Sequence, residues 1–483
     1  MTQNQQSSEN SEISLTKTFW PLYLLNGFQH ISFGGFIVLV LPLSLLMWPD
    51  DSYHALEIGI LITVLFWSDS LAGLIFGRFI DKYSRKLIIT IISIFRAFSM
   101  IMIGFAYVGK GIETWWYFLI FVFIFGTFSG GSWPAVVSIS NDAVPKQQRS
   151  RFFGYYQIIR TVATMLGYLV ASYLVQSGFW RQFFWGIGFC ILIMGFIFMM
   201  YTAEPKRGAQ REELMHVLKD DSIEYDFKID WETMRKTMLS KTNKVALIEG
   251  IFTMILMGSL TFLVLPYIQS PPYNISPFST SVFLVIFGLT GGLLGTILLA
   301  RLCDKIAIKH PIRRIPMIIL SIVGGLLTYA FIFFLPLPHL TVEQGKDIPY
   351  LMVLPMIWIM GIVYFSSRSL FSLYIVNQAP ILQEINLPEA QGKITSWNQF
   401  LESLGRGIAP LMAGILLVMT ALNYQFVVMI IILCIIPGIV LWMLALKWFE
   451  DDSSIIKDLL NERAEILKVR KFNNSNPSSS IKP

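Results

Sequence analysis

The stretch GRFIDKYSRK, from Gly77 to Lys86, decides the fold because it places a charged turn between two apolar segments. WSDSLAGLIF precedes it and LIITIISIF follows it. Five of its ten side chains carry a formal charge, namely Arg78, Asp81, Lys82, Arg85 and Lys86. Apolar segments joined by a short charged turn are typical of a helical hairpin that crosses a membrane and turns in water.

The composition extends this interpretation to the whole chain. Of its 483 residues, 54% are hydrophobic and 14% are charged, and the mean hydropathy is +0.60. A soluble domain carries about a quarter charged residues. Only helices and closed barrels satisfy their backbone hydrogen bonds in lipid, and the apolar runs here are continuous rather than alternating. The sequence therefore predicts an all-α integral membrane protein.

Twelve apolar segments are long enough to cross about 30 Å of hydrocarbon as helices. The predicted spans are 20–45, 56–79, 87–108, 116–140, 152–175, 183–202, 244–267, 279–300, 315–336, 350–378, 394–419 and 425–447. They divide the chain into an N-terminal tail (1–19), a first six-helix half (20–202), a polar linker (203–243), a second six-helix half (244–447) and a C-terminal tail (448–483). REELMHVLKDD and DWETMRKTMLSK in the linker, and SSIIKDLLNERAEILKVRKF in the tail, predict amphipathic helices on the membrane surface.

The distribution of basic residues predicts the orientation. Of the 37 Lys and Arg, 30 fall in the tails or in loops on one side of the predicted spans, whereas Lys110, Arg181 and Lys346 fall on the other side. Lys and Arg accumulate on the cytoplasmic side of a membrane. We therefore expect a multi-pass protein of the cell membrane with both termini in the cytoplasm. The net charge of +6 then reports topology, and it does not indicate nucleic-acid binding.

The two halves repeat each other. AGLIFGRFIDKYSRK, at the end of the second span, aligns with GTILLARLCDKIAIK at the end of the eighth, and YYQIIRT in the fifth span aligns with WNQFLES in the eleventh. The alignment pairs Arg78, Asp81 and Lys82 with Arg301, Asp304 and Lys305, and Gln157 with Gln399. Two parallel six-helix halves are typical of secondary transporters, whose binding site lies near the membrane midplane between the halves.

GRFIDKYSRK resembles the loop motif of the major facilitator superfamily, G-x-L-a-D-r-x-G-r-k, and it lies between spans two and three as in that family. Phe79 stands where Leu is usual, Ser84 stands where the second Gly is usual, and the second copy has Ala300 in place of the first Gly. The resemblance covers nearly the whole chain. It implies a transporter with twelve helices in two pseudo-symmetric halves that works by alternating access.

A finer resemblance is to the spinster branch, which carries lipid-like amphiphiles. It rests on QQRSRFFGYYQI and on EPKRG just after span six. That branch tends to have an acid in a G-E-A-S-like turn of span four. The corresponding turn here is SGGSW, from Ser129 to Trp133, and it has no acid. This departure puts the branch's usual proton-coupling residue in doubt.

The charged turn predicts a conformational latch. Gly73 and Gly77 form a small-xxx-small face that lets helices approach, and Asp81 is placed to accept hydrogen bonds from the N-terminus of a facing helix. The resemblance implies that this helix is the eleventh span and that the latch steadies the outward-facing state. For Arg85 and Lys86, the alternative that basic residues only enforce topology stays open. The predicted latch residues are Gly73, Gly77, Arg78, Asp81, Arg85, Lys86, Arg301, Asp304 and Lys305.

Seven charges fall inside the predicted spans: Arg96, Arg160, Arg368, Arg406, Asp69, Glu249 and Glu402. Each costs at least about 2.5–3.5 kcal/mol at the bilayer centre if it faces lipid unpaired. Asp69 in span two and Arg96 in span three lie equally far from the turn that joins these spans, which predicts an ion pair between them. The alternative is that Asp69 exchanges between Arg96 and Arg406 as the halves move, which would make it a bistable element.

The remaining intramembrane charges have their own alternatives. Glu402 and Arg406, four residues apart, either neutralise one another or share a cavity floor with Arg160. Arg368 has no partner by spacing, so its planar guanidinium predicts an anchor for a phosphate or carboxylate. Glu249 lies near the start of its span, and we expect it to reach the interface.

Polar and aromatic residues complete the predicted binding site. His30 either carries a proton near neutral pH or is a packing residue. Trp133, next to Pro134, suggests a bend with an aromatic wall. With Arg368, the predicted substrate-binding set is Asn26, Gln29, His30, Trp133, Gln157, Asn377 and Gln399.

No catalytic constellation, phosphate-binding Gly-Lys-Ser/Thr loop or metal-spaced Cys/His cluster occurs in the sequence, so we expect neither an enzyme nor a cofactor or metal. The first hypothesis is a monomeric carrier of an amphiphilic or organic anion, with membrane lipids as partners. The second is a proton-coupled exporter of cationic drugs, or a transporter of small metabolites. The third is a non-transporting receptor on the same fold.

Overall fold

The computed structural model describes residues 14–49, 53–144, 148–204, 230–387 and 390–475. The predicted amphipathic segment at 211–221 lies outside these residues. In the first half the helices are α1 (Leu15–Val38), α2 (Val40–Met47), α3 (Ala55–Lys82), α4 (Arg85–Gly104), α5 (Ile112–Gly130), α6 (Ser132–Ala143), α7 (Arg149–Gln176) and α8 (Trp180–Tyr201). Because α1 and α2 meet at a bend of 67°, they form one broken span. α5 continues into α6 as a single span.

The second half begins after the short helix α10 (Trp231–Lys236). Its elements are α11 (Lys241–Gln269), α12 (Pro277–Phe283), the π-helix η2 (Leu284–Leu289), α13 (Thr290–Ala307), the 3₁₀ turn η3 (Pro311–Arg313), α14 (Arg314–Phe334), α15 (Val342–Lys346), α16 (Ile348–Val353), α17 (Pro355–Glu384), α18 (Gln391–Met419) and α19 (Tyr424–Ser475). α12, η2 and α13 follow one another as a single span.

Within the described residues, eleven helices are long and apolar enough to cross a membrane, and the bent pair α1–α2 makes the number twelve. The predicted twelve-span architecture is confirmed. The end of the chain differs from prediction, because the twelfth span and the amphipathic segment after it form one continuous helix, α19. No Gly or Pro interrupts the sequence from Trp442 to Asn476, and extending an existing helix is much easier than nucleating a new one.

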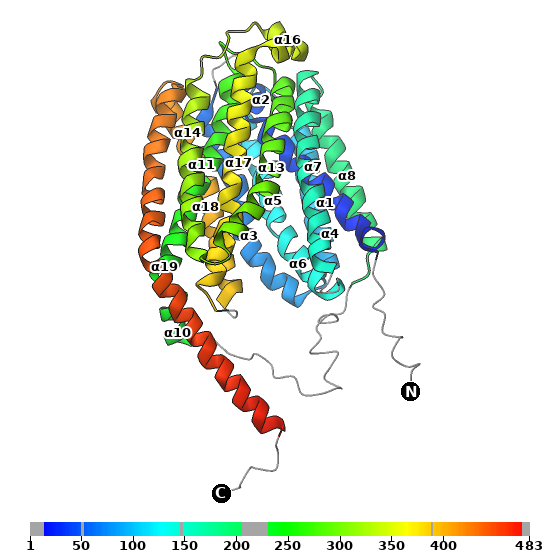
Figure 1. Ribbon diagram of the computed structural model, residues 1–483. Helices are drawn as coiled ribbons and strands as arrows, with labels where there is room; N and C mark the ends of the chain where they lie inside the picture. The colour runs from blue at the N-terminus through cyan, green and yellow to red at the C-terminus, as the bar shows by residue number, and fades with distance from the viewer. Residues whose placement is uncertain (1–13, 50–52, 145–147, 205–229, 388–389, 476–483) are drawn as a thin grey trace, which may run out of the picture.

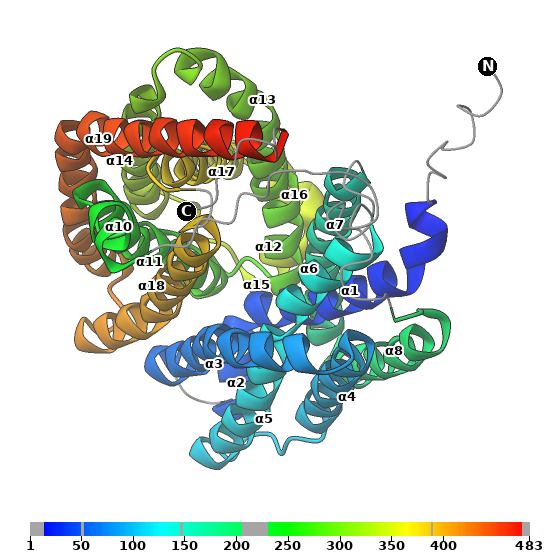
Figure 2. The same cartoon turned by 90° about the horizontal axis from the view of Figure 1, so that it is seen from below.

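The helices form two bundles that stand side by side (Figures 1 and 2). α1 packs on α7, and α4 packs on α8, in the first half; α11 packs on α19, and α14 packs on α17, in the second. The halves meet where α3 lies along α18 and where α7 lies along α12. We name the face that carries the end of α8 and the start of α11 the linker face, and the opposite one the far face.

The middle of α19 is tied to the second half at the linker face. Asp452 accepts a hydrogen bond of 2.9 Å from the backbone N–H of Thr242, at the start of α11. Lys457 forms an ion pair of 3.3 Å with Glu384, at the end of α17. Ser453 donates a hydrogen bond of 3.2 Å to the same carboxylate. α19 therefore belongs mechanically to the second half.

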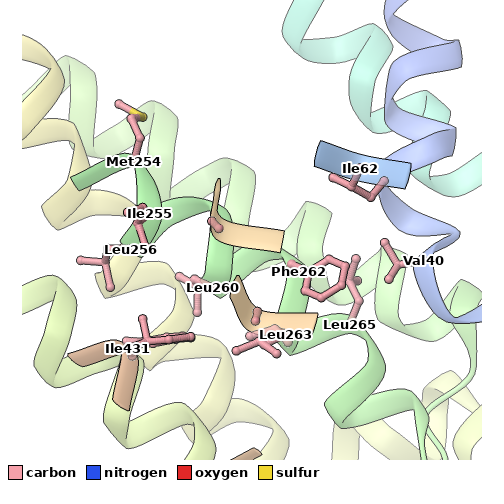
Figure 3. Packing of buried hydrophobic residues seen from close by; sticks show 14 of the residues in the cluster. Val40, Ile62, Met254, Ile255, Leu256, Leu260, Phe262, Leu263, Leu265 and Ile431 are labelled. Carbon is pink, nitrogen blue, oxygen red and sulfur yellow. The ribbon is translucent and has the colours of Figure 1, made fainter. Parts of the chain in front are cut away.

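A far-face seal closes the space between the halves on the side opposite the linker. Val40 and Ile62 of the first half lie next to Phe262 and Leu265 of α11, and all four side chains are buried (Figure 3). Further out, the backbone N–H of Phe278 in α12 donates a hydrogen bond of 3.3 Å to Gln176 Oε1 at the end of α7.

The seal extends along α3 and α18, which are almost in backbone contact. A Cβ on Gly59 would lie 2.5 Å from the carbonyl oxygen of Pro410, and one on Gly414 would lie 2.5 Å from that of Ala55. Deeper in, Thr63 Oγ1 donates a 2.7 Å hydrogen bond to the carbonyl of Gly407. Small residues permit such close approach because no side chain separates the helices.

The bundle of the first half depends on an equally close approach of α1 and α7. A Cβ on Gly34 would overlap the carbonyl oxygen of Thr164, and a Cβ on Gly167 would overlap that of Ile31. Backbone atoms cannot move aside as a flexible side chain can. Both positions therefore require glycine for its lack of a side chain.

We predict that Gly167→Ala destabilises the folded protein by about 1–3 kcal/mol, the usual cost of overpacking a tight contact. Gly154→Ala, on the same helix, is the matched control, because no atom lies within 4 Å of the Cβ it would add. Thermal unfolding of both purified variants checks the difference. Equal midpoints for the two variants would contradict this account of α1–α7 packing.

Candidate functional site: a cavity between the two halves

The main cavity lies between the halves and has a volume of about 390 Å³. α1 and α7 of the first half line one side of it, and α11, η2, α13 and α17 of the second half line the other. Its polar groups include His30, Gln157, Arg160 and Arg368. We call this space the polar lobe.

A second space of about 240 Å³ adjoins the polar lobe, and Phe33, Ile37, Tyr168, Thr261 and Arg368 line both. Its other walls are mostly apolar, and we call it the apolar lobe. These walls are Val40, Ile62, Phe66, Met254, Met257, Gly258, Phe262, Phe371, Arg406 and Pro410. Arg368 thus stands at the junction of a polar and an apolar space.

The arginines of the cavity are not neutralised by direct ion pairs. In the described part of the chain, Arg160, Arg368 and Arg406 have no carboxylate oxygen within 4.0 Å. The guanidinium of Arg406 instead lies 6.0 Å from the ring centre of Phe66 and 3.6 Å from Met254 Sδ. The cavity is consequently cationic.

Asp69 lies in the field of three arginines without bonding to any. Arg96, Arg406 and Arg160 are close enough to interact with its carboxylate electrostatically. The predicted Asp69–Arg96 ion pair is wrong for this conformation, because Arg96 donates instead to the carbonyl oxygen of Gln29, at 3.0 Å, and to Ser132 Oγ, at 3.4 Å. Arg96 also stacks over the Phe125 ring at 4.8 Å. The Gln29 carbonyl and the Phe125 ring are therefore the partners of Arg96, in the place that the prediction gave to the Asp69 carboxylate.

Glu402 and Arg406 interact electrostatically, but they form no direct ion pair among the described residues. Glu402 Oε1 instead accepts from Asn398 Nδ2 at 2.9 Å and from the Tyr374 hydroxyl at 3.4 Å. One other prediction about buried charge needs correction. Glu249 does not reach an interface, because its side chain is fully buried in the second half. α11 begins at Lys241, which places Glu249 about 12 Å into the helix.

Of the predicted substrate-binding residues, His30, Gln157 and Arg368 line the cavity. Nδ1 of His30 is buried without a hydrogen-bond partner. The other predicted residues, which do not line either lobe, are Asn26, Gln29, Trp133, Asn377 and Gln399.

Several of those residues have structural partners instead. Asn26 donates to the carbonyl of Tyr156 at 3.2 Å, and Gln29 donates to Ser93 Oγ at 3.2 Å. Trp133 is exposed and packs against the rings of Phe153 and Tyr156. Gln399 is exposed on α18.

Asn377 belongs to a polar cluster at the linker face of the second half. It accepts a 3.1 Å hydrogen bond from Arg314, which also forms a 2.7 Å ion pair with Asp304. Its amide donates to Cys303 Sγ at 3.2 Å. Asp304, predicted as a latch residue, therefore ties α13 to α14 within its own half in this conformation.

A sequence profile of the Major Facilitator Superfamily matches residues 19–410. The chain belongs to the major facilitator superfamily. It is a membrane transporter and not an enzyme, as the sequence predicted.

Known structures agree with this assignment at the level of the fold. A bacterial homolog of the human lysosomal transporter Spinster, in an inward-facing and unoccupied conformation, superposes with a TM-score of 0.67 at 15% identity, over 91% of this chain and 98% of that one. The nucleoside transporter NupG gives 0.61 at 16% identity, over 90% and 100%. A D-xylose–proton symporter gives 0.58 at 15% identity, over 87% and 97%.

Among characterised sequences, a putative glycerol-3-phosphate transporter 1 of Arabidopsis thaliana is 26% identical over 157 residues. The match spans 32% of this chain and 30% of that protein. It covers too little of the relative to carry the relative's activity to this chain.

The superfamily's loop motif has a clear partner at the linker face, and sequence reasoning missed it. Glu204, which follows α8, accepts hydrogen bonds from Ser84 Oγ at 2.7 Å and from the backbone N–H groups of Arg85 at 3.1 Å and Lys86 at 2.9 Å. Arg85 Nε adds an ion pair of 3.0 Å. A carboxylate on the free N–H groups at a helix start is favourable because of the helix dipole. EPKRG, which contains Glu204, was the available signal.

The rest of the predicted latch is only partly visible. The side chain of Asp81 and the first side chains of α18 lie outside the described residues. Gly73 does face another helix, since a Cβ there would lie 3.2 Å from the carbonyl of Gly130 in α5. Gly77 does not, since no atom lies within 4 Å of the Cβ it would carry. Arg78, Arg301 and Lys305 are exposed at the linker face.

The Glu204 contact predicts a pH dependence of stability. Burial alone would raise the pKa of Glu204, but hydrogen bonds from Lys86, Ser84 and Arg85 outweigh it and hold the pKa below its usual value. A group whose pKa is lowered on folding stabilises the protein above its unfolded pKa, about 4.3, and loses that contribution as the pH falls further. Glu204→Gln should therefore unfold at a lower temperature than wild type at neutral pH, and the difference should shrink below about pH 4. Thermal unfolding across this range checks it, and a difference that grows on acidification would refute it.

Proposed function

We propose that the chain is an alternating-access carrier of an amphiphilic molecule with an anionic head group. The observation that carries the proposal is the position of Arg368 between the polar and apolar lobes. A head group bonded to Arg368 would leave its chain in the apolar lobe.

The charges of the cavity favour an anion. Arg160, Arg368 and Arg406 face the two lobes, whereas Asp69 and Glu402, the acids that interact electrostatically with Arg406, line neither. A guanidinium binds phosphate or carboxylate with two parallel hydrogen bonds. A cationic drug would meet repulsion in the same place, which argues against the cationic-drug part of the second hypothesis.

The walls of the apolar lobe favour an acyl chain. Phe66, Phe262, Phe371, Met254 and Met257 supply aromatic and thioether surfaces. Methionine adapts its shape to irregular apolar ligands. The likeness in fold to the bacterial Spinster homolog is compatible with a lipid-like cargo, and it supports the spinster-branch interpretation of the sequence.

A small phosphate ester is the second candidate cargo. The partial match to a putative glycerol-3-phosphate transporter favours it. Such a molecule would need Arg160 and Arg368 for its phosphate group, but it would not need the apolar lobe. The two candidates differ in one testable respect, which is their dependence on the apolar walls.

Alternating access is supported by the asymmetry of the contacts between the halves. Trp67 Nε1 of α3 donates a hydrogen bond of 3.2 Å to the carbonyl of Leu404 in α18. Trp67 lies about 22 Å along α3 from the end of that helix at the linker face. Closer to that face, Leu74, Ile75 and Trp397 are each more than half exposed. The far-face seal is closed, so we infer a conformation open toward the linker face. The basic residues of that face make it the cytoplasmic one by the positive-inside rule. A static receptor has no need of such a seal.

Arg368→Ala should weaken the binding of oleoyl lysophosphatidate by at least about tenfold, since a charged hydrogen bond contributes about 1.5–3 kcal/mol. Arg313→Ala, which changes an exposed arginine away from both lobes, is the matched control and should bind like wild type. Ligand-induced thermal stabilisation of the purified protein measures both. Unchanged binding by Arg368→Ala, or stabilisation by cationic amphiphiles instead, would overturn the proposed head-group site.

Met257→Trp tests the apolar lobe. The larger ring should fill part of the 240 Å³ space and reduce the affinity for oleoyl lysophosphatidate severalfold. Binding of glycerol 3-phosphate should stay unchanged if this ester is also a ligand. Wild-type affinity of Met257→Trp for the long-chain lipid would exclude the apolar lobe as the chain site and favour the small ester as cargo.

A further inference from the structure

Two carboxyl groups of the second half, on Glu249 and Glu402, lie outside the lining of both lobes and have no role in the proposed head-group site. Within the described residues, neither has a Lys, Arg or His nitrogen within 4.0 Å. Burying an ionised carboxylate without such a partner costs several kcal/mol. Their presence therefore requires an explanation other than ion pairing.

Glu249 is the more isolated of the two. Its side chain is fully buried, Oε1 accepts a hydrogen bond from the Thr253 hydroxyl, and Oε2 has no partner. Gly438 of α19 lies alongside, since a Cβ there would be 3.6 Å from Glu249 Oε1. Nε1 of Trp442, also on α19, is buried beside the carboxyl and interacts with it. The described surroundings thus offer Glu249 two uncharged donors and no cation, which leaves a buried negative charge uncompensated.

Glu402 stands at one end of a hydrogen-bonded chain and is partly exposed. Asn398 and the Tyr374 hydroxyl bond to its Oε1, and Gln378 Nε2 bonds to that hydroxyl at 2.7 Å and to Asn398 Oδ1 at 3.0 Å. Glu402 packs against Gly250 of α11. A Cβ at Gly250 would lie 3.2 Å from Glu402 Cγ and 3.4 Å from the Tyr374 hydroxyl, so a side chain there would crowd both groups.

The titratable and charged groups around this pair are few. Tyr374 of α17 interacts electrostatically with both carboxyls, and the carboxyls interact with each other. Arg406, one turn along α18, interacts with Glu402 and with Asp69 of α3, which packs against α18. α19 contributes the uncharged Trp442.

We propose that Glu249 and Glu402 form a proton-binding site that holds one exchangeable proton. Two carboxyls in one field cannot both ionise easily, so the pair carries a charge of −1 with the proton and −2 without it. The proton comes from water at the partly exposed Glu402 and returns there. The site is separate from the cavity but adjoins it through Arg406.

Arg406 links this proton to the cargo, an extension that rests on the proposed function. Arg406 stabilises the ionised form of Glu402, and it also lines the apolar lobe. An anion that binds near Arg406 neutralises its charge and thereby favours the protonated pair. Linkage is reciprocal, so the proton in turn favours the anion. The expected transport mode is anion–proton symport.

Infrared difference spectroscopy of the full chain in lipid nanodiscs, between mildly acidic and mildly alkaline pH and without any substrate, tests the proton site. Wild type should show the C=O stretch of a protonated carboxyl that disappears on the alkaline side. Glu249→Gln and Glu402→Gln should each lose a component of this band that the matched control Asp69→Asn keeps. Retention of that component in both glutamine variants, or its loss in Asp69→Asn, overturns the proposal.

Glu249→Gln should fold with a near wild-type unfolding temperature, because an amide has the shape of the neutral acid. If it does not fold, Glu402→Gln decides the infrared test alone. Proton uptake from weakly buffered solution on addition of oleoyl lysophosphatidate then tests the linkage. We expect about one proton per bound anion in wild type and none in Glu402→Gln; equal uptake by both overturns the linkage. The infrared result needs no cargo, so failure of the head-group site in the Arg368 experiment is distinguishable from failure of the proton site.

Discussion

The cost of placing a charge in the membrane interior governs this structure. Four arginines and three acids lie within the spans, and lipid tolerates none of them unpaired. These charges occupy different environments. Arg96 lies against a backbone carbonyl and an aromatic ring, Arg160 and Arg368 face a cavity, and Glu249 is buried with a hydrogen bond from the Thr253 hydroxyl.

Charges at the ends of the helices behave differently, because water and free backbone groups are available there. Glu204 closes the start of α4, and Asp304 joins α13 to α14 through Arg314. Both contacts stay within one half. They make each bundle a stiff unit, so relative motion is left to the interface where α3 meets α18 and α7 meets α12.

The sequence predicted the spans and the two halves well, because crossing a membrane constrains length and hydropathy more strongly than any tertiary contact does. It also pointed to His30, Gln157, Arg160 and Arg368, since polar groups inside spans seldom face lipid. It misplaced Asn377, whose partners Cys303 and Arg314 come from other helices. Glu204 escaped notice because half of its hydrogen bonds come from backbone N–H groups, which leave no sequence pattern. The apolar lobe had no signal because apolar residues also face lipid.

The continuity of α19 makes it a lever. From Lys447 to Ser475 the helix runs about 42 Å beyond the predicted end of the last span, and Asp452 and Lys457 fix it to the second half. Each degree by which that half rotates against the first would move the tip by roughly 0.7 Å. A motion too small to resolve at the cavity is thus amplified at the linker face. The end of α19 is accordingly the natural position for a spectroscopic reporter of the transport cycle.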